Sequence, residues 1–427
     1  MKRAIIRVTV VAILSLIFAT AGCASFSKTA PDPGEPTNIS ALQPAHPSQL
    51  EGIRYDTAAF ALVADMEAGW NLGNALDSLD HQKAGIYTQL QMQTPEEYYE
   101  TFWGNPVTTP KVISDVAKIG FGAVRIPVTW QDHMNDDNEI SRSWLDRVKQ
   151  IVDDVLNNDM YCIINLHHDT GSGTWPWLNA DPSMLDENKE ILCKVWNQIA
   201  VFFQDYNELL LFESFNEILD AQDRWTGSTP ESYEAVNQLN QAFVDTVRAT
   251  GGMNSNRFLV VNPYAASVNS EILRSFRLPV DTVDNRLIVG VHTYAPAGFT
   301  WRQDMATWTE TFSAWDEESA ITEVSAMLQP LYDNMVKKGI PVIISECGAW
   351  NKNNTSDRCA YAAFLVREAA KYNITCFWWD EGGKHSSLES VNNTALYDRY
   401  NERWLFPEVA AAFINRVDGD SASEREP

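Results

Sequence analysis

Short and almost uninterrupted apolar runs recur along the chain, and each is followed by a longer segment whose apolar residues have helical spacing. Runs of this kind are typical of strands that are buried on both faces of a parallel sheet. Eight of them occur between Ala68 and Trp379. They cover residues 68–72, 123–127, 161–166, 209–214, 258–261, 287–291, 341–345 and 375–379.

The segments between the runs carry the signals of helix starts and ends. Thr109-Pro110 is typical of a helix start and Gly120 of its end, and Thr229-Pro230 and Gly251 enclose a second helix in the same way. Eight strand-plus-helix units within about 310 residues are the number expected of one closed barrel. We therefore predict the α/β class and a single (β/α)8 TIM barrel. A doubly wound open sheet is the alternative, but no glycine-rich phosphate loop follows the first run.

Both ends of the chain depart from the barrel pattern. Residues 1–22 contain three basic residues and an apolar run, and we predict that they are an export signal. Ala21-Gly22-Cys23 resembles a bacterial lipobox, in which Cys23 is lipidated, whereas Ala19-Thr20-Ala21 would permit ordinary secretion. We expect a membrane-anchored lipoprotein at the bacterial cell surface, with a secreted protein as the alternative. The remaining segments are predicted as a flexible tether (23–50), the barrel domain (51–416) and a disordered acidic tail (417–427).

The composition restricts the class of partner. The chain has 32 Lys and Arg against 57 Asp and Glu, which gives a formal net charge of −25. Such a chain is unsuited to binding nucleic acid, whose phosphates require neutralisation by basic side chains. It also contains 15 Trp, 14 Tyr and 18 Phe, which indicates aromatic surfaces with a role besides core packing. A neutral polyhydroxylated partner such as a sugar fits both facts, and no obligate protein partner is evident.

Chemically active side chains gather where the predicted strands end, which is where a barrel of this kind builds its active site. Three of the seven histidines are among them. In chain order these residues are Arg125, His167, His168, Asn216, Glu217, His292, Tyr294, Glu346, Trp378 and Trp379.

Two glutamates at these ends, Glu217 and Glu346, indicate glycoside cleavage by double displacement. One carboxyl group protonates the leaving oxygen and the other attacks the anomeric carbon, which requires the two groups to be about 5–5.5 Å apart. We expect Arg125 and His292 to lie beside Glu346 and to keep it ionised. Asn216 is placed to bond the 2-hydroxyl group of a sugar.

Five motifs, in this order along the chain, resemble glycoside hydrolase family 5. They are Gly69-Trp70-Asn71-Leu72-Gly73-Asn74, Phe102-Trp103-Gly104-Asn105-Pro106, Val124-Arg125-Ile126-Pro127-Val128-Thr129-Trp130, Asn216-Glu217 and Ser345-Glu346-Cys347-Gly348. The resemblance covers roughly residues 55–415 and is greatest to the endo-β-1,4-glucanase branch that includes xyloglucanases and lichenases. It implies that Glu217 is the acid/base and Glu346 the nucleophile.

The same resemblance implies a set of supporting residues: Arg125, His167, Asn216, His292, Tyr294 and the tryptophan of the eighth strand. We assign that tryptophan to Trp379, because it directly precedes Asp380, with Trp378 as the alternative. Asn71 and His168 complete the candidate binding set. The Asn216-Glu217-Ile218 triplet departs from the Asn-Glu-Pro that is commoner in the family.

The expected function is therefore that of a retaining, cofactor-free endo-β-1,4-glucanase, a cellulase acting on cellulose or soluble β-glucan. Xyloglucan, mixed-linkage glucan or mannan could be the backbone cleaved instead, because the catalytic residues are shared among these activities. A surface glycan-binding protein without turnover and a metal-dependent barrel hydrolase are alternatives of other classes. No metal is predicted, because the adjacent side chains of His167 and His168 diverge and no third ligand has matching spacing.

Several residues have a structural interpretation beside a functional one. Glu213 is in phase with Glu217 along a strand, so we expect it to be a buried partner of Arg125. Two roles remain open for His133 and His168: each could line the cleft or order a loop. Five loop tryptophans could stack on sugar rings or pack internally: Trp175, Trp177, Trp301, Trp308 and Trp350. Five cysteines are expected to be buried free thiols, with one disulfide as the alternative: Cys162, Cys193, Cys347, Cys359 and Cys376.

Overall fold

A computed structural model describes residues 57–80, 94–301 and 311–414. The predicted export signal, Cys23, the tether and the acidic tail lie outside these residues, as does Trp308. Within the described part of the chain, no helix has both the length and the apolar character needed to cross a bilayer.

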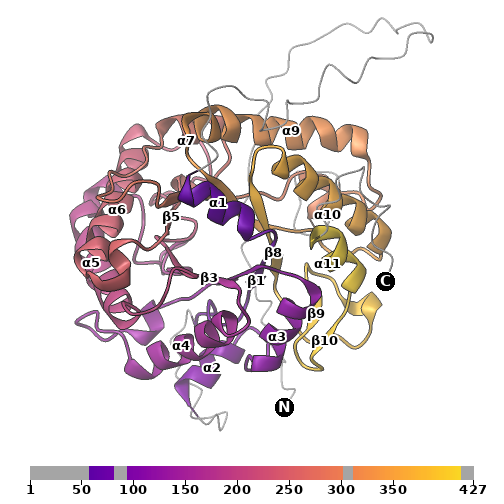
Figure 1. Ribbon diagram of the computed structural model, residues 1–427, viewed down its shortest axis with the longest axis horizontal. Helices are drawn as coiled ribbons and strands as arrows, with labels where there is room; N and C mark the ends of the chain where they lie inside the picture. The colour runs from indigo at the N-terminus through magenta and orange to yellow at the C-terminus, as the bar shows by residue number, and fades with distance from the viewer. Residues whose placement is uncertain (1–56, 81–93, 302–310, 415–427) are drawn as a thin grey trace, which may run out of the picture.

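Eight parallel strands form a closed barrel in the order β1 to β8, and β8 pairs with β1 through Gly69 and Phe377. This confirms the predicted (β/α)8 architecture (Figure 1). The strands are β1 (Gly69–Leu72), β2 (Ala123–Ile126), β3 (Tyr161–Asn165), β4 (Leu210–Glu213), β5 (Leu259–Val261), β6 (Leu287–His292), β7 (Val342–Cys347) and β8 (Thr375–Asp380).

Helices surround the barrel, and a short antiparallel pair of strands, β9 (Tyr397–Asp398) and β10 (Arg403–Trp404), follows β8 (Figure 1). The helices are α1 (Ala58–Asp65), α2 (Pro95–Thr101), α3 (Pro110–Ile119), α4 (Arg142–Leu156), α5 (Leu185–Phe202), α6 (Pro230–Ala249), α7 (Ser270–Ser275), α8 (Ala297–Thr300), α9 (Glu317–Asn334), α10 (Thr355–Ala370) and α11 (Pro407–Ile414).

The main core lies between the strands and the surrounding helices. Trp144 of α4 and Trp196 of α5 are fully buried in it, as their helical spacing predicts. All five cysteines of the described residues are free thiols, and three of them are buried.

A second, smaller core fills one end of the barrel. Leu62 and Val63 of α1 pack there against inward-facing strand residues such as Ile163 and Phe377. In Figure 1, α1 accordingly lies across the middle of the ring of strands. The filled end contains the earlier residues of the strands, so their carboxyl ends are left to build the site at the opposite end.

Candidate active site

Alternation along the strands decides which side chains enter the barrel. Ala123 and Phe377 face inward in the small core, and side chains two positions later on the same strands face the same way. Arg125 and Trp379 are those next inward residues, nearer the carboxyl ends of β2 and β8. Trp378 faces the opposite way, toward the helices.

A register irregularity places Glu346 in the same space. Ile343 faces inward in the small core, so strict alternation would direct Glu346 outward. The pairing of β7 with β8 shifts between Ile344 and Cys347, and the pairing of β6 with β7 shifts between Val291 and His292. These irregularities redirect the nucleophile candidate into the barrel mouth and bring it opposite His292.

Glu217, His292 and Glu346 form the centre of the site. One carboxylate oxygen of each glutamate and a ring nitrogen of His292 lie within 4.8 Å of one another. Both glutamates are buried, with 8% and 6% of their surface exposed. A separation this short suits a retaining mechanism, because inverting enzymes hold their carboxyl groups about 6.5–9.5 Å apart.

His292 bridges the two glutamates. Its Nδ1 lies 2.7 Å from Oε1 of Glu217, at hydrogen-bond distance. Its Nε2 lies 3.6 Å from Oε1 of Glu346. The imidazole therefore contacts both carboxyl groups and couples the charge of one to the charge of the other.

Two further donors hold Glu346. Arg125 donates through Nη1 to its Oε1 at 2.7 Å, and the hydroxyl of Tyr294 donates to its Oε2 at 3.2 Å. Arg125 is fully buried and also donates to Glu213 at 2.6 Å, which confirms the predicted partnership of these two residues. Its remaining hydrogen bonds go to Oδ1 of Asn71 and Oδ1 of Asn216. The guanidinium thus joins strands β1, β2, β4 and β7 around the nucleophile candidate.

Arg125 and His292 lie beside Glu346 as expected, and both act to lower its pKa. Burial raises the pKa of Glu346, and although the charges of His292 and Arg125 lower it, the net pKa lies above the ordinary value. Burial acts to lower the pKa of His292, but the charges of Glu346 and Glu217 outweigh it, so the pKa of His292 is raised. Arg125 and His292 therefore limit the rise in the pKa of Glu346 but do not cancel it.

This balance predicts how activity depends on pH. A nucleophile must be ionised, so kcat/KM should fall as the pH drops through the raised pKa of Glu346. His292→Gln removes a cation that lowers that pKa, so the acid limb of the profile should move to higher pH than in the unmodified protein. Profiles of kcat/KM from pH 4 to 8 (roughly the range in which carboxyl and imidazole groups titrate) measure the shift. A limb that stays in place or moves to lower pH would contradict this interpretation.

Trp379 and His167 form an aromatic wall beside the glutamates. Their rings are stacked, with centroids 5.7 Å apart and planes within 10°. Gly73 also lies close to the indole, where an added Cβ would approach a ring carbon of Trp379 to 2.7 Å. Trp379, Tyr294 and Trp301 make a cluster separate from the main core. The position of the tryptophan is therefore set from several sides, as a rigid binding surface requires.

The tautomer of His167 follows from its neighbours. Oδ1 of Asn165 accepts a hydrogen bond from the backbone of Val128, so the amide nitrogen of Asn165 faces Nδ1 of His167 at 3.2 Å and donates to it. The proton of the ring then resides on Nε2, which becomes a donor. Burial lowers the pKa of His167 well below its usual range, which keeps the ring neutral. The sequence interpretation missed Asn165, although it lies two residues before His167 on the same strand.

His168 has a different role from its neighbour. It is half-buried, and its Nδ1 donates to the backbone carbonyl of Asp77 at 2.7 Å. Its ring contacts Trp103 and Trp175, whose centroids are 5.0 and 6.1 Å away. The residue therefore orders the loop after β1 and also belongs to an aromatic surface next to the site.

Two groups of side chains have the spacing of metal ligands among the described residues. One is the central trio, and the other is Asp77, His167 and His168. In the second group, Asn165 already donates to Nδ1 of His167, and the carboxylate of Asp77 accepts two backbone N–H groups at 2.7 and 3.1 Å. With Nδ1 of His167 occupied and its ring proton on Nε2, neither nitrogen of this residue has a free lone pair, so the group fits hydrogen bonding better than ligation.

Two candidate residues lie away from the site. Trp378 is fully buried among the helices, where its ring contacts Phe413 and its Nε1 donates to the backbone of Thr394. Successive strand residues face opposite sides, so the alternative assignment of the eighth-strand binding tryptophan to Trp378 is wrong. His133 stacks on Trp144 at 3.6 Å, and burial lowers its pKa to about 3, so it is a core residue.

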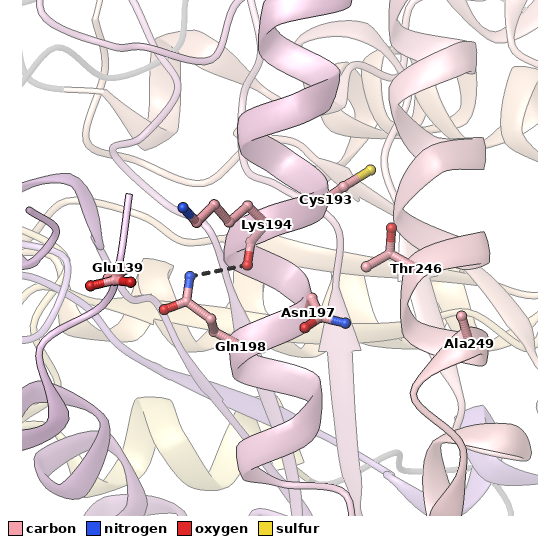
Figure 2. A pocket seen from close by; sticks show the side chains of 7 residues that line it. All are labelled: Glu139, Cys193, Lys194, Asn197, Gln198, Thr246 and Ala249. Carbon is pink, nitrogen blue, oxygen red and sulfur yellow. Dashed lines mark hydrogen bonds between the residues drawn. The ribbon is translucent and has the colours of Figure 1, made fainter. Parts of the chain in front are cut away.

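One surface groove lies away from the glutamate pair. It is a groove of about 640 Å³ between α5 and α6, and Figure 2 shows that polar side chains such as Lys194, Gln198 and Thr246 line it. No residue predicted for the site is among its lining residues. The groove does not bear on the chemistry of the glutamate pair.

Comparison with known proteins gives consistent matches. The family described as Cellulase (glycosyl hydrolase family 5) matches residues 87–385. The cellulase/esterase CelE of Acetivibrio thermocellus is 36% identical over 413 residues, which are 95% of this chain and 46% of CelE. The chain thus spans about half the length of that curated relative.

Solved structures extend the similarity to the fold. A broad-specificity GH5-4 endoglucanase from Ruminococcus champanellensis with bound cellotriose is 37% identical, with a TM-score of 0.74. The match covers 85% of this chain and 100% of that one. XEG5A, a xyloglucan-specific endo-β-1,4-glucanase from a metagenomic library in complex with cellotriose, is 33% identical with the same TM-score. It covers 84% of this chain and 99% of that one.

Proposed function

Because the chain belongs to glycosyl hydrolase family 5, we propose that it is a retaining endo-β-1,4-glucanase that cleaves β-glucan backbones by double displacement. The observation that carries this proposal is the placement of Glu217 and Glu346, whose oxygens lie within 4.8 Å of each other across His292. The similar endoglucanases named above support the class of substrate.

In the first step Glu217 acts as the acid and Glu346 as the nucleophile. The carboxyl proton of Glu217 passes to the glycosidic oxygen while an oxygen of Glu346 bonds to the anomeric carbon, and the bond to the leaving sugar breaks. Arg125 and Tyr294 donate hydrogen bonds to Glu346 and fix its direction of attack. His292 contacts both carboxyl groups, so its ring can stabilise the negative charge that appears on Glu217 as the proton leaves.

In the second step water releases the bound sugar. Glu217, now ionised, takes a proton from that water, whose oxygen attacks the anomeric carbon and frees the carboxylate of Glu346. Two inversions at one carbon give net retention of the β configuration. The two steps call for no cofactor, because Glu217 carries out both proton transfers and Glu346 supplies the nucleophile.

The residues around the pair suit one sugar ring. Trp379 offers an apolar face on which a pyranose ring can stack, and Nε2 of His167 is a donor beside it. Oδ1 of Asn216 accepts from Arg125, which leaves the amide nitrogen to donate to the 2-hydroxyl group. We assign these three residues, with Asn71 behind Arg125, to binding the sugar whose bond is cleaved.

A panel of pure polysaccharides tests this function. Reducing-sugar release from carboxymethyl cellulose and barley mixed-linkage β-glucan is the result expected, with xyloglucan as the favoured second substrate because XEG5A is specific for it. Mannan completes the panel. The absence of release from every glucan would contradict the proposal and favour a glycan-binding protein.

We also propose that the protein is exported and anchored by lipid on Cys23, on the strength of the lipobox-like Ala21-Gly22-Cys23 and the preceding apolar run. Replacing Cys23 by serine removes the thiol that carries the lipid, so the protein should move from the membrane fraction to the soluble exported fraction. Cell fractionation with immunodetection measures this shift, and Ser25→Ala is a matched control. An unchanged membrane fraction for the Cys23→Ser variant would contradict the anchor.

A further inference from the structure

A single lysine joins the loops that follow β6 and β7, the strands that carry His292 and Glu346. Lys352 lies in the loop between β7 and α10, six residues after Glu346. Its Nζ donates to three backbone carbonyls: Phe299 at 2.7 Å, Phe312 at 3.0 Å and Gly298 at 3.3 Å. Gly298 and Phe299 belong to α8, the short helix that follows β6. The lysine therefore connects the strand of the nucleophile to the strand of His292 and Tyr294.

The connection continues from α8 to the tyrosine that holds the nucleophile. The hydroxyl of Thr300, at the end of α8, donates to the backbone carbonyl of Tyr294. The backbone of Trp350, two residues before Lys352, donates to the carbonyl of Thr300 at 3.0 Å. The ring of Trp301 packs edge-on against Tyr294, with centroids 6.0 Å apart. The hydroxyl of Tyr294 then reaches Oε2 of Glu346 at 3.2 Å.

The chemistry of Lys352 is suited to this position. An ammonium group has three N–H donors, and here all three directions meet main-chain carbonyls, two of them at the carboxyl end of α8. Among the residues that the structure describes, no carboxylate forms an ion pair with it. Burial lowers its pKa to about 8, which is the cost of holding a cation there with carbonyl dipoles alone. A lysine needed only for solubility would remain in water.

We propose that Lys352 is a positioning residue that fixes the β6–α8 segment and thereby holds the hydroxyl of Tyr294 on the nucleophile Glu346. This inference rests on the proposed function, since it assigns Glu346 the nucleophilic role. Lys352 itself touches neither substrate nor reacting atoms. It acts through Thr300, Trp301 and Tyr294.

A double-mutant cycle separates this role from a general effect on folding. Lys352→Met removes the charge and the N–H donors while keeping the approximate length of the side chain. Tyr294→Phe removes only the hydroxyl. Each single variant should lower kcat on barley β-glucan by about tenfold to a hundredfold, with little change in KM. If Lys352 acts through Tyr294, the kcat of the double variant should be no lower than the kcat of the less active single variant.

Two further variants control the experiment. Lys352→Arg keeps the charge and the N–H donors and should retain most of the activity. Lys337→Met removes an exposed lysine in the short helical turn after α9 and should behave as the unmodified protein. Losses that multiply in the double variant, or an unchanged kcat in a folded Lys352→Met protein, would overturn the proposal.

A crystal structure of the Lys352→Met variant gives a readout that does not depend on activity. The proposal predicts that the hydroxyl of Tyr294 moves out of hydrogen-bond distance of Glu346. A tyrosine that stays in place would overturn the positioning role even if the protein cleaves no glucan. Inactivity of the unmodified protein on all glucans would instead contradict the proposed function.

Discussion

Replacing Glu346 by alanine should lower kcat on carboxymethyl cellulose by about 10⁴-fold or more, because the covalent intermediate can no longer form. The fold should persist. Arg125 loses one partner but keeps its two hydrogen bonds to Glu213, at 2.6 and 3.3 Å, so no unpaired buried charge remains. Initial rates and the midpoint of thermal unfolding, measured on the same preparations, separate the loss of chemistry from a loss of stability.

Two additions make the Glu346 prediction specific. Azide can enter the space left by the side chain and attack the anomeric carbon directly, which should give a glycosyl azide of inverted configuration. Glu190→Ala, at an exposed position on α5, is the control for removing one carboxyl group and should leave kcat unchanged. Substantial activity in a folded Glu346→Ala protein would rule out this residue as the nucleophile.

Replacing Glu217 by alanine should have the second-largest effect, a loss of about 10²- to 10⁴-fold in kcat on polysaccharides. The loss should depend on the leaving group. A nitrophenyl cellobioside releases a phenolate that needs no proton, so formation of the glycosyl-enzyme should be nearly normal and its hydrolysis slow. Pre-steady-state release of nitrophenol should therefore show a burst.

Azide distinguishes the roles of the two glutamates. In the Glu217→Ala variant it attacks the glycosyl-enzyme without a general base, which should restore turnover and give a glycosyl azide of retained β configuration. The Glu346→Ala variant should give the opposite anomer. Equal losses on polysaccharide and on the nitrophenyl substrate, with no burst, would contradict the assignment of Glu217 as the acid/base.

Much of the fold could be predicted because each strand is buried on both faces and each helix has one apolar face. Those patterns depend only on local periodicity, so the number and order of the units followed directly. The contact between Arg125 and Glu213 was also predictable, because both residues are in phase with the inward side of their strands.

Other features depend on contacts that periodicity does not report. Strict alternation would direct Glu346 away from the barrel, and only the irregular register of β7 brings it inward. His133 and His168 looked equivalent as loop histidines, but the ring of His133 stacks on Trp144 in the core. Lys352 lies more than 50 positions from the two carbonyls of α8 that it binds. A contact between such distant loops requires the closed barrel to be known.

The net pKa of Glu346 was not predictable for a related reason. Its two cationic neighbours could be expected from the strand ends, but the extent of burial could not. Burial and the charge of Glu217 raise the pKa of this carboxyl group, and together they outweigh the lowering by His292 and Arg125. Which of these opposing effects prevails cannot be decided without coordinates.

The anomeric configuration of the first product tests the glutamate pair most directly. Proton NMR during the first minutes of cleavage of a cello-oligosaccharide records which anomer appears before mutarotation. The placement of Glu217 and Glu346 predicts the β-anomer first, with the α-anomer growing in later. Initial appearance of the α-anomer would mean single displacement by water, and the double-displacement account would be wrong.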